Sequence, residues 1–112
     1  MVKKKYVPNK GDLVILTFDP QVGDEQKGRR PALVVSNYQF NKGVGLALVC
    51  PISNTNRDFP FHVAVDGEQM GGYILTEQVK SIDYEVKRMK FVEVLEEEKL
   101  DKVLGIIEAI LR

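Results

Sequence analysis

The chain of 112 residues has little of several residue types that carry protein chemistry: it contains one cysteine, one histidine and no tryptophan. A single cysteine excludes a disulfide within the chain, and one cysteine with one histidine cannot form a Cys/His zinc cluster. Cys50 lies inside the apolar run VGLALVCPI, which indicates a small buried side chain and a reducing compartment.

The sequence also lacks net charge and long hydrophobic runs. Its 16 lysines and arginines balance 16 aspartates and glutamates, so a surface that attracts nucleic acid must be local. The longest apolar stretch is far shorter than the ~20 residues of a membrane helix, and MVKKK leads into YVPNKGD rather than into the apolar segment of a signal peptide. We therefore expect one cytoplasmic domain over residues 1–112, without membrane association.

Short runs rich in β-branched residues alternate with Gly, Asn, Asp and Pro, which predicts strands joined by turns. The runs cover residues 12–18, 31–36, 44–52, 61–65 and 73–82, and residues 91–95 are a candidate for a sixth strand. This spacing is typical of a small β barrel or sandwich. Apolar residues at consecutive positions indicate that several strands are covered on both faces.

The hydrophobic period changes near the C-terminus and predicts a closing amphipathic helix. The apolar positions with helical spacing are Leu100, Val103, Leu104, Ile107 and Leu111. Three glutamates at 96–98 precede them, where a helix N-terminus favours anions. Ile106 and Ile110 widen the stripe, which suits either a dimer contact or deeper burial in the chain's own core. The predicted fold is mainly β with a C-terminal helix (α+β).

The connection between the first two predicted strands, residues 19–30, is longer than an ordinary hairpin loop and carries GDEQKGRR. Lys27, Arg29 and Arg30 present cations together. Pro31 restricts Arg30 to an extended backbone, and the strand that follows anchors it, so its guanidinium suits bidentate phosphate recognition. The alternative interpretation is a mobile hairpin with solubilising charges.

The segment GDLVILTFDPQVGDEQKGRRPALVVS resembles the N-terminal signature of the MazF/PemK family of bacterial toxin endoribonucleases. The shared parts are a G-D strand, a D-P turn, a G-x-E-Q-x-G loop and an R-P that opens the second strand. VCPIS, PFHV and LTEQVKSID also have counterparts, so the resemblance covers nearly the whole chain. It implies a small SH3-like β barrel of the CcdB/MazF toxin type, and a homodimer. It also implies metal-independent, sequence-specific cleavage of single-stranded RNA that needs no cofactor and is blocked by a cognate antitoxin.

The resemblance places the family's catalytic arginine on Arg30 and its partner threonine on Ser53. Serine keeps the hydroxyl donor but loses the γ-methyl that restricts the rotamer. The RNA supplies its own 2′-hydroxyl nucleophile, so Arg30 and Ser53 are expected to stabilise charge on the phosphorane, giving a 2′,3′-cyclic phosphate and a 5′-hydroxyl. The three cations near Glu25 lower its pKa, which favours an orienting role toward Arg30 over a general base. A loop salt bridge without catalytic effect is the alternative for Glu25.

Further RNA contacts are predicted on the same loop and at the end of the fifth strand, where amides and carboxylates can read base edges and cations can follow phosphates. The predicted RNA-binding residues are Asp24, Gln26, Lys27, Arg29 and Gln78. The only histidine, His62, lies in PFHVAV, and we assign it to the polar face of a strand rather than to catalysis.

Two alternatives to an endoribonuclease remain. One is a non-enzymatic toxin of the same fold that binds a protein, as CcdB-like gyrase poisons do with a C-terminal Trp-Gly-Ile. This chain has no tryptophan and ends in AILR, which counts against that interpretation. The other is a catalytically silent family member, suggested by Ser53 at the position where threonine is expected.

Overall fold

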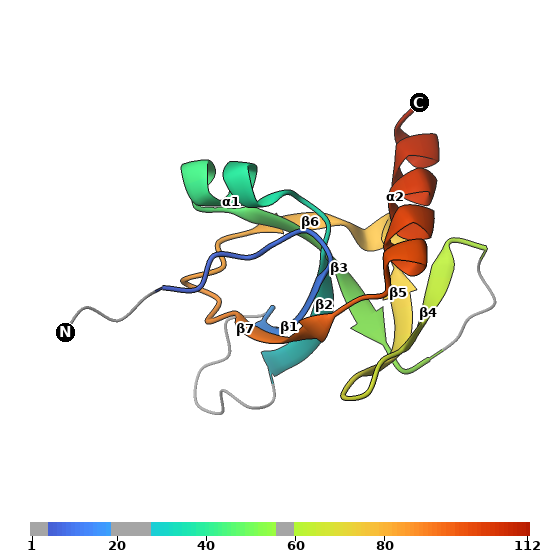
Figure 1. The fold of residues 1–112 in the computed structure, drawn as a ribbon, viewed down its shortest axis with the longest axis horizontal. Helices are drawn as coiled ribbons and strands as arrows, with labels where there is room; N and C mark the ends of the chain where they lie inside the picture. Colours follow the sequence, from blue (N-terminus) through green and yellow to red (C-terminus); the bar gives the residue numbers. More distant parts are fainter. Residues whose placement is uncertain (1–4, 19–27, 56–59) are drawn as a thin grey trace.

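The computed structural model describes residues 5–18, 28–55 and 60–112. Its strands are β1 (Asp12–Thr17), β2 (Arg29–Val34), β3 (Ala47–Ser53), β4 (His62–Asp66), β5 (Gly71–Leu75), β6 (Lys80–Ile82) and β7 (Lys90–Val94). The helices are α1 (Tyr38–Val44) and α2 (Glu97–Leu111), with a short 3-10 turn, η2, at Thr76–Gln78 (Figure 1). The predicted class, mainly β with a C-terminal helix, is confirmed.

One antiparallel sheet runs in the order β4-β5-β3-β2-β1-β7, and β6 pairs with β3 outside this path. Successive parts of β3 have different partners: Ala47 to Val49 pair with β6, and its last residues, Ile52 and Ser53, pair with β5. Along its other edge, Val49 to Pro51 pair with β2. Because one strand passes between several partners, the sheet curls into a half-barrel, with α2 beside β4 and η2 (Figure 1).

Both faces of the central strands are buried, as the consecutive apolar positions predicted. The cluster on the α2 side includes Leu13, Leu33, Cys50, Ile74 and Val103. The cluster on the other face includes Val14, Leu16, Val34, Val49 and Ile82. Neighbouring residues of β1 and β2 belong to opposite clusters because side chains alternate along a strand. Burial, with a smaller contribution from the charge of Glu77, raises the pKa of Cys50 to about 12.

Helix α1 occupies residues that were expected to form a turn, together with the first residue of the strand expected over 44–52. Its N-cap, Asn37, accepts a hydrogen bond from the Phe40 N–H at 2.8 Å, and Gly45 ends the helix with a φ of 80°. The buried Asn41 amide donates to the carbonyl of Pro8 at 2.9 Å and to that of Ser36 at 3.1 Å. This helix is therefore held by its two caps and by the buried Asn41 amide, and it has no apolar stripe that the sequence could reveal.

The single strand expected over 73–82 is divided into β5, η2 and β6. The Thr76 hydroxyl donates to the Phe61 carbonyl at 2.6 Å, and His62 Nε2 lies 3.2 Å from Glu77 Oε2. These contacts turn the chain at η2 without glycine or proline. The candidate strand at 91–95 is present as β7.

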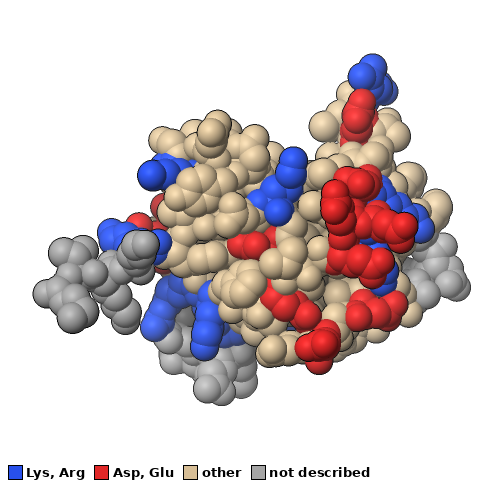
Figure 2. All heavy atoms as spheres, viewed as in Figure 1, with Lys and Arg blue, Asp and Glu red and all other residues tan. Residues whose placement is uncertain are grey.

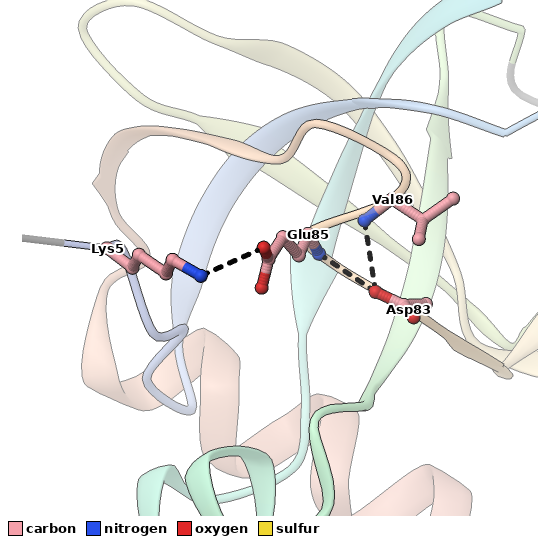
Figure 3. A network of polar contacts seen from close by, with 4 residues as sticks. All are labelled: Lys5, Asp83, Glu85 and Val86. Atoms are coloured by element: carbon pink, nitrogen blue, oxygen red, sulfur yellow. Dashed lines mark hydrogen bonds and ion pairs between the residues drawn. The ribbon is translucent and has the colours of Figure 1, made fainter.

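The turn between β6 and β7 is organised by one carboxylate (Figure 3). Asp83 Oδ1 accepts the N–H of Glu85 at 3.1 Å and that of Val86 at 3.0 Å. Lys5 Nζ lies 3.2 Å from Glu85, but both side chains are mostly exposed, so this ion pair adds little stability. The turn brings the backbone of Lys87 against β1, where the Thr17 N–H donates to the Lys87 carbonyl at 2.9 Å.

Helix α2 packs on the sheet through its N-terminal half. Val103 is fully buried, and Lys99 Nζ donates to the Ala64 carbonyl at 2.9 Å. At the other end, Ile110 is 47% exposed and Leu111 is 77% exposed, where the helix extends past the sheet (Figure 1). Within the described residues, neither helix has the length and apolar character needed to cross a membrane.

Candidate active site

A hollow forms where β2 and β3 separate. The two strands pair at three positions, of which Ala32 with Pro51 is the last. Beyond it β3 pairs with β5, while β2 stays paired with β1 through Leu16 and Arg30. Proline offers no N–H to a partner strand, so the change of partner at Pro51 leaves no donor unpaired there. The hollow that opens between the strands has a volume of about 480 Å³, and we call it the Arg30 hollow.

Polar and apolar side chains line different parts of the Arg30 hollow. The polar lining residues are Arg30, Ser53, Asn54, Thr55, Gln78 and Lys80. The apolar ones are Phe18, Pro31, Pro51, Ile52 and Leu75. Among the described lining residues there are two cations and no carboxylate, so this surface attracts anions.

Strand register explains why Arg30 and Ser53 line the same hollow. Extending the β2–β3 register by two residues beyond its last pair sets Arg30 opposite Ser53, on the same face. Arg30 is exposed, and in the described part of the chain its guanidinium makes no hydrogen bond or ion pair. The structure therefore brings three predicted site residues, Arg30, Ser53 and Gln78, to one hollow.

The Ser53 backbone is seated closely against β5. Gly72 has a φ of +124°, and a Cβ built on it would lie 2.8 Å from the Ser53 carbonyl oxygen. Only glycine combines this φ with such an approach, so residue 72 keeps the end of β3 in place. The Ser53 side chain has its own contact: Oγ accepts the N–H of Thr55 at 3.1 Å.

Lys80, Phe18, Asn54 and Thr55 belong to the hollow but were missed by sequence reasoning. Lys80 opens β6, and its Nζ lies 5.0 Å from the centroid of the Phe18 ring, within range of a cation–π contact. The sequence could have indicated Lys80, because it lies two residues after Gln78, a predicted RNA contact, in TEQVK. In the same way, Thr55 could have been included in the site, because it comes two residues after Ser53 at the end of β3.

Arg29, predicted to bind RNA, does not line the Arg30 hollow. Its guanidinium donates to the Arg88 carbonyl at 2.7 Å, with longer contacts of 3.5 Å to the carbonyls of Ile15 and Lys87. Adjacent strand residues point to opposite faces, so Arg29 turns away from Arg30. It ties the start of β2 to β1 and to the turn after β6. The remaining predicted residues, Asp24, Glu25, Gln26 and Lys27, lie outside the described residues.

His62 lies on the polar face of β4, as expected, because the buried Val63 and Val65 point to the opposite face. Its side chain is 3% exposed and is paired with Glu77. Partial burial alone would raise the pKa of Glu77, but hydrogen bonds from its own backbone and from His62 outweigh this, and the pKa lies below its ordinary value. This pair supports the turn that carries Gln78 into the hollow.

A second hollow, of about 290 Å³, has the opposite charge. Its charged lining residues are Asp66, Glu68, Glu93, Glu96 and Lys99. Figure 2 shows acidic side chains gathered around this region, near the start of α2. Such a surface repels RNA. Across the described segments, no group of three or more His, Cys, Asp or Glu residues could hold a metal ion.

Comparisons with known proteins identify relatives of this chain. The chain is 40% identical to the endoribonuclease toxin MazF of Escherichia coli K12 over 74% of this chain and 75% of the relative. It is 35% identical to the endoribonuclease toxin ChpB of the same organism over 98% of both. The crystal structure of MazF from Deinococcus radiodurans superposes with a TM-score of 0.84 at 35% identity, over 96% of this chain and 98% of that one. A MazE–MazF complex from the same organism gives a TM-score of 0.84 at 30% identity, over 96% and 97% of the two chains.

The family model of the PemK-like, MazF-like toxins of type II toxin-antitoxin systems matches residues 9–111. This range contains every strand and helix described above. The chain belongs to this family.

Proposed function

We propose that this chain is the toxin of a toxin-antitoxin pair and acts as an endoribonuclease on single-stranded RNA. One observation carries the proposal: two cations and several hydroxyl and amide groups line the Arg30 hollow, with no described carboxylate among them. The relatives named as endoribonuclease toxins support it. The whole range 1–112 would act as a single domain in the cytoplasm, where messenger RNA is available.

The reaction uses groups that the hollow provides. The 2′-hydroxyl of the RNA releases its proton to solvent and its oxygen attacks the adjacent phosphorus. The bond to the 5′-oxygen breaks and that oxygen takes a proton from solvent, which leaves a 2′,3′-cyclic phosphate and a 5′-hydroxyl. Negative charge grows on the phosphorane oxygens during this step. The Arg30 guanidinium and the Ser53 hydroxyl donate hydrogen bonds to those oxygens, and fixed donors aimed at developing charge lower the barrier.

Recognition of the RNA falls to the groups around this centre. The Gln78 amide can donate to and accept from the edge of an unstacked base, and Lys80 can hold a neighbouring phosphate. We retain Asp24, Gln26 and Lys27 as proposed RNA contacts and Glu25 as the residue that orients Arg30. We do not retain Arg29, since its guanidinium is bonded to backbone carbonyls.

The test is to incubate purified protein with a long single-stranded RNA in excess EDTA and to map the new 5′ ends. We expect cuts at discrete positions whose ends are labelled by polynucleotide kinase without prior phosphatase treatment. Arg30→Ala protein, purified in the same way, controls for contaminating nucleases. Activity lost on chelation and restored by magnesium would refute the metal-independent mechanism. Intact RNA under both conditions would favour a protein-binding or catalytically silent toxin.

The Arg30 hollow also suggests how the activity is restrained. We propose that the cognate antitoxin covers it with an acidic segment, which is disordered when free and orders on binding. In the solved MazE–MazF complex the relative is found with its antitoxin. Protein purified with the antitoxin encoded beside it should bind RNA only after the antitoxin is removed. A neutralised complex that still binds RNA in competition assays would contradict this arrangement.

The exposed end of α2 supports a homodimer, because Ile110 and Leu111 leave apolar surface uncovered. Light scattering at micromolar concentration should give twice the chain mass of 12.7 kDa. Ile110→Asp should shift the protein toward monomer. Val86→Asp, in the turn after β6, introduces the same charge away from α2 and is the control. A monomeric wild-type protein at that concentration would contradict the proposal.

A further inference from the structure

The hydroxyl of Ser53 is less restricted in orientation than that of the threonine expected at this position. A serine hydroxyl can occupy three staggered χ1 wells, whereas the γ-methyl of a threonine restricts that choice. A donor must stand in the right well before the transition state forms if it is to stabilise the charge that develops there. The serine in this chain therefore needs another restraint on its side chain.

The structure provides that restraint at the end of β3. The Thr55 N–H donates to Ser53 Oγ at 3.1 Å, which favours the well that keeps Oγ beside residue 55. This bond uses an oxygen lone pair and leaves the hydroxyl proton free to donate. A donor to Oγ also polarises the hydroxyl and strengthens the bond that it can make.

The backbone on which this side chain stands is fixed independently. Ser53 pairs with Tyr73 of β5, and the close approach of Gly72 leaves no space behind the Ser53 carbonyl. With the backbone fixed, the orientation of the hydroxyl depends mainly on χ1. The Thr55 N–H is the described group that contacts the Ser53 hydroxyl.

We propose that Thr55 is a positioning residue for catalysis: its backbone N–H holds the Ser53 hydroxyl toward the Arg30 hollow and replaces the restraint of a threonine γ-methyl. This inference rests on the proposed endoribonuclease function. It concerns the amide of residue 55 and is independent of the Thr55 hydroxyl.

The experiment compares Thr55→Pro, which removes the N–H, with Thr55→Ala, which keeps it while also losing the hydroxyl. The measurement is the single-turnover cleavage rate at saturating RNA, together with the KM for the same RNA. If Oγ then samples its three wells about equally, the proline variant should cut about threefold more slowly than the alanine variant. The KM should not change, because the restraint acts on the transition state.

A rescue separates positioning from general damage to the loop. Ser53→Thr supplies the γ-methyl, so in its presence the proline and alanine variants at 55 should cut at the same rate. In a Ser53→Ala background, the proline should cause no further loss, because the hydroxyl that it misplaces is absent. Melting temperatures of all variants confirm that folded protein is compared.

Two different results would overturn different claims. If Ser53→Ala cuts RNA at the wild-type rate, the proposed role of Ser53 in catalysis is wrong. If Ser53→Ala is slow but Thr55→Pro and Thr55→Ala are equally fast, only the positioning role of residue 55 is wrong. A slow Thr55→Pro variant that Ser53→Thr does not rescue, or that adds its loss to that of Ser53→Ala, also contradicts the positioning role.

Discussion

Arg29 and Arg30 are adjacent on β2 and have the same side chain, yet they lie in opposite environments. Arg29 donates to backbone carbonyls on β1 and on the turn after β6. Arg30 is exposed at the rim of a hollow that lacks described carboxylates. The alternation of side chains along a strand thus directs Arg29 to backbone carbonyls of the fold and Arg30 to the hollow. Removal of the Arg29 side chain should reduce stability, and removal of the Arg30 side chain should reduce activity.

The largest effect is expected for Arg30→Ala. The cleavage rate should fall by on the order of a hundredfold or more, the size of effect seen when one donor to developing charge is removed. The melting temperature should stay at the wild-type value, since the Arg30 guanidinium makes no hydrogen bond or ion pair with other described residues. Arg30→Lys should remain closer to alanine than to wild type, because a point charge does not reproduce the planar guanidinium.

Lys42→Ala is the matched control for this measurement, because it removes a cation from α1, outside the Arg30 hollow. Its cleavage rate should equal that of the wild type. An Arg30→Ala protein that cuts at nearly the wild-type rate under saturating RNA would mean that Arg30 only positions the substrate.

Arg29→Ala should show the opposite pattern. The carbonyls of Ile15 and Arg88 lose a charged donor, which should lower the free energy of unfolding by about 1–2 kcal/mol in urea denaturation. Cleavage per folded molecule should stay within a few-fold of wild type. A large loss of RNA affinity with unchanged stability would instead support the RNA contact that the sequence predicted for Arg29.

A smaller effect is expected at the turn that receives Arg29. Asp83→Ala removes the acceptor for two N–H groups and should cost about 0.5–1.5 kcal/mol of stability. Because the turn and Arg29 share the Arg88 carbonyl, combining Asp83→Ala with Arg29→Ala should destabilise by less than the sum of the two. Strict additivity in denaturation experiments would show that the two contacts are independent.

The smallest effect concerns the support of η2 and depends on pH. The pKa of Glu77 is lower in the folded chain than its ordinary value of 4.5, so its contribution is present above that pH and is lost as the pH falls through the folded-state pKa. Glu77→Gln should therefore melt at a lower temperature than wild type at neutral pH, and this difference should disappear in acid. A difference that persists unchanged in acid would show that protonation of Glu77 does not control it.

Much of the fold could be predicted because each strand carries its own local signal. The β-branched runs located most strands, and the 3.6-residue period located α2. Helix α1 was missed because its buried position is an asparagine, which gives no apolar period. The break at η2 was missed because side-chain contacts of Thr76 and Glu77 make it, and no glycine or proline marks it.

The candidate site, like the fold, could be predicted from the sequence only in part. Arg30 and Ser53 were identified by their positions in the family motif. Arg30 was also correctly expected to have an extended backbone beside a strand. Arg29 was placed in the loop, whereas β2 begins at this residue. The expected strand began at residue 31, two residues after the start of β2. Within a strand, neighbouring side chains point to opposite faces, so Arg29 lies in a different environment from Arg30 and does not join it in the hollow.

The buried Cys50 has a practical consequence for studying RNA binding and subunit exchange in solution. With a pKa of about 12 and no exposed surface, its thiol stays protonated and out of reach of maleimide reagents at neutral pH. A cysteine introduced at Val86, which is 70% exposed, would then be the single reactive handle on the chain. A fluorophore at position 86 can report on RNA binding and subunit exchange, and Cys50 does not have to be replaced first.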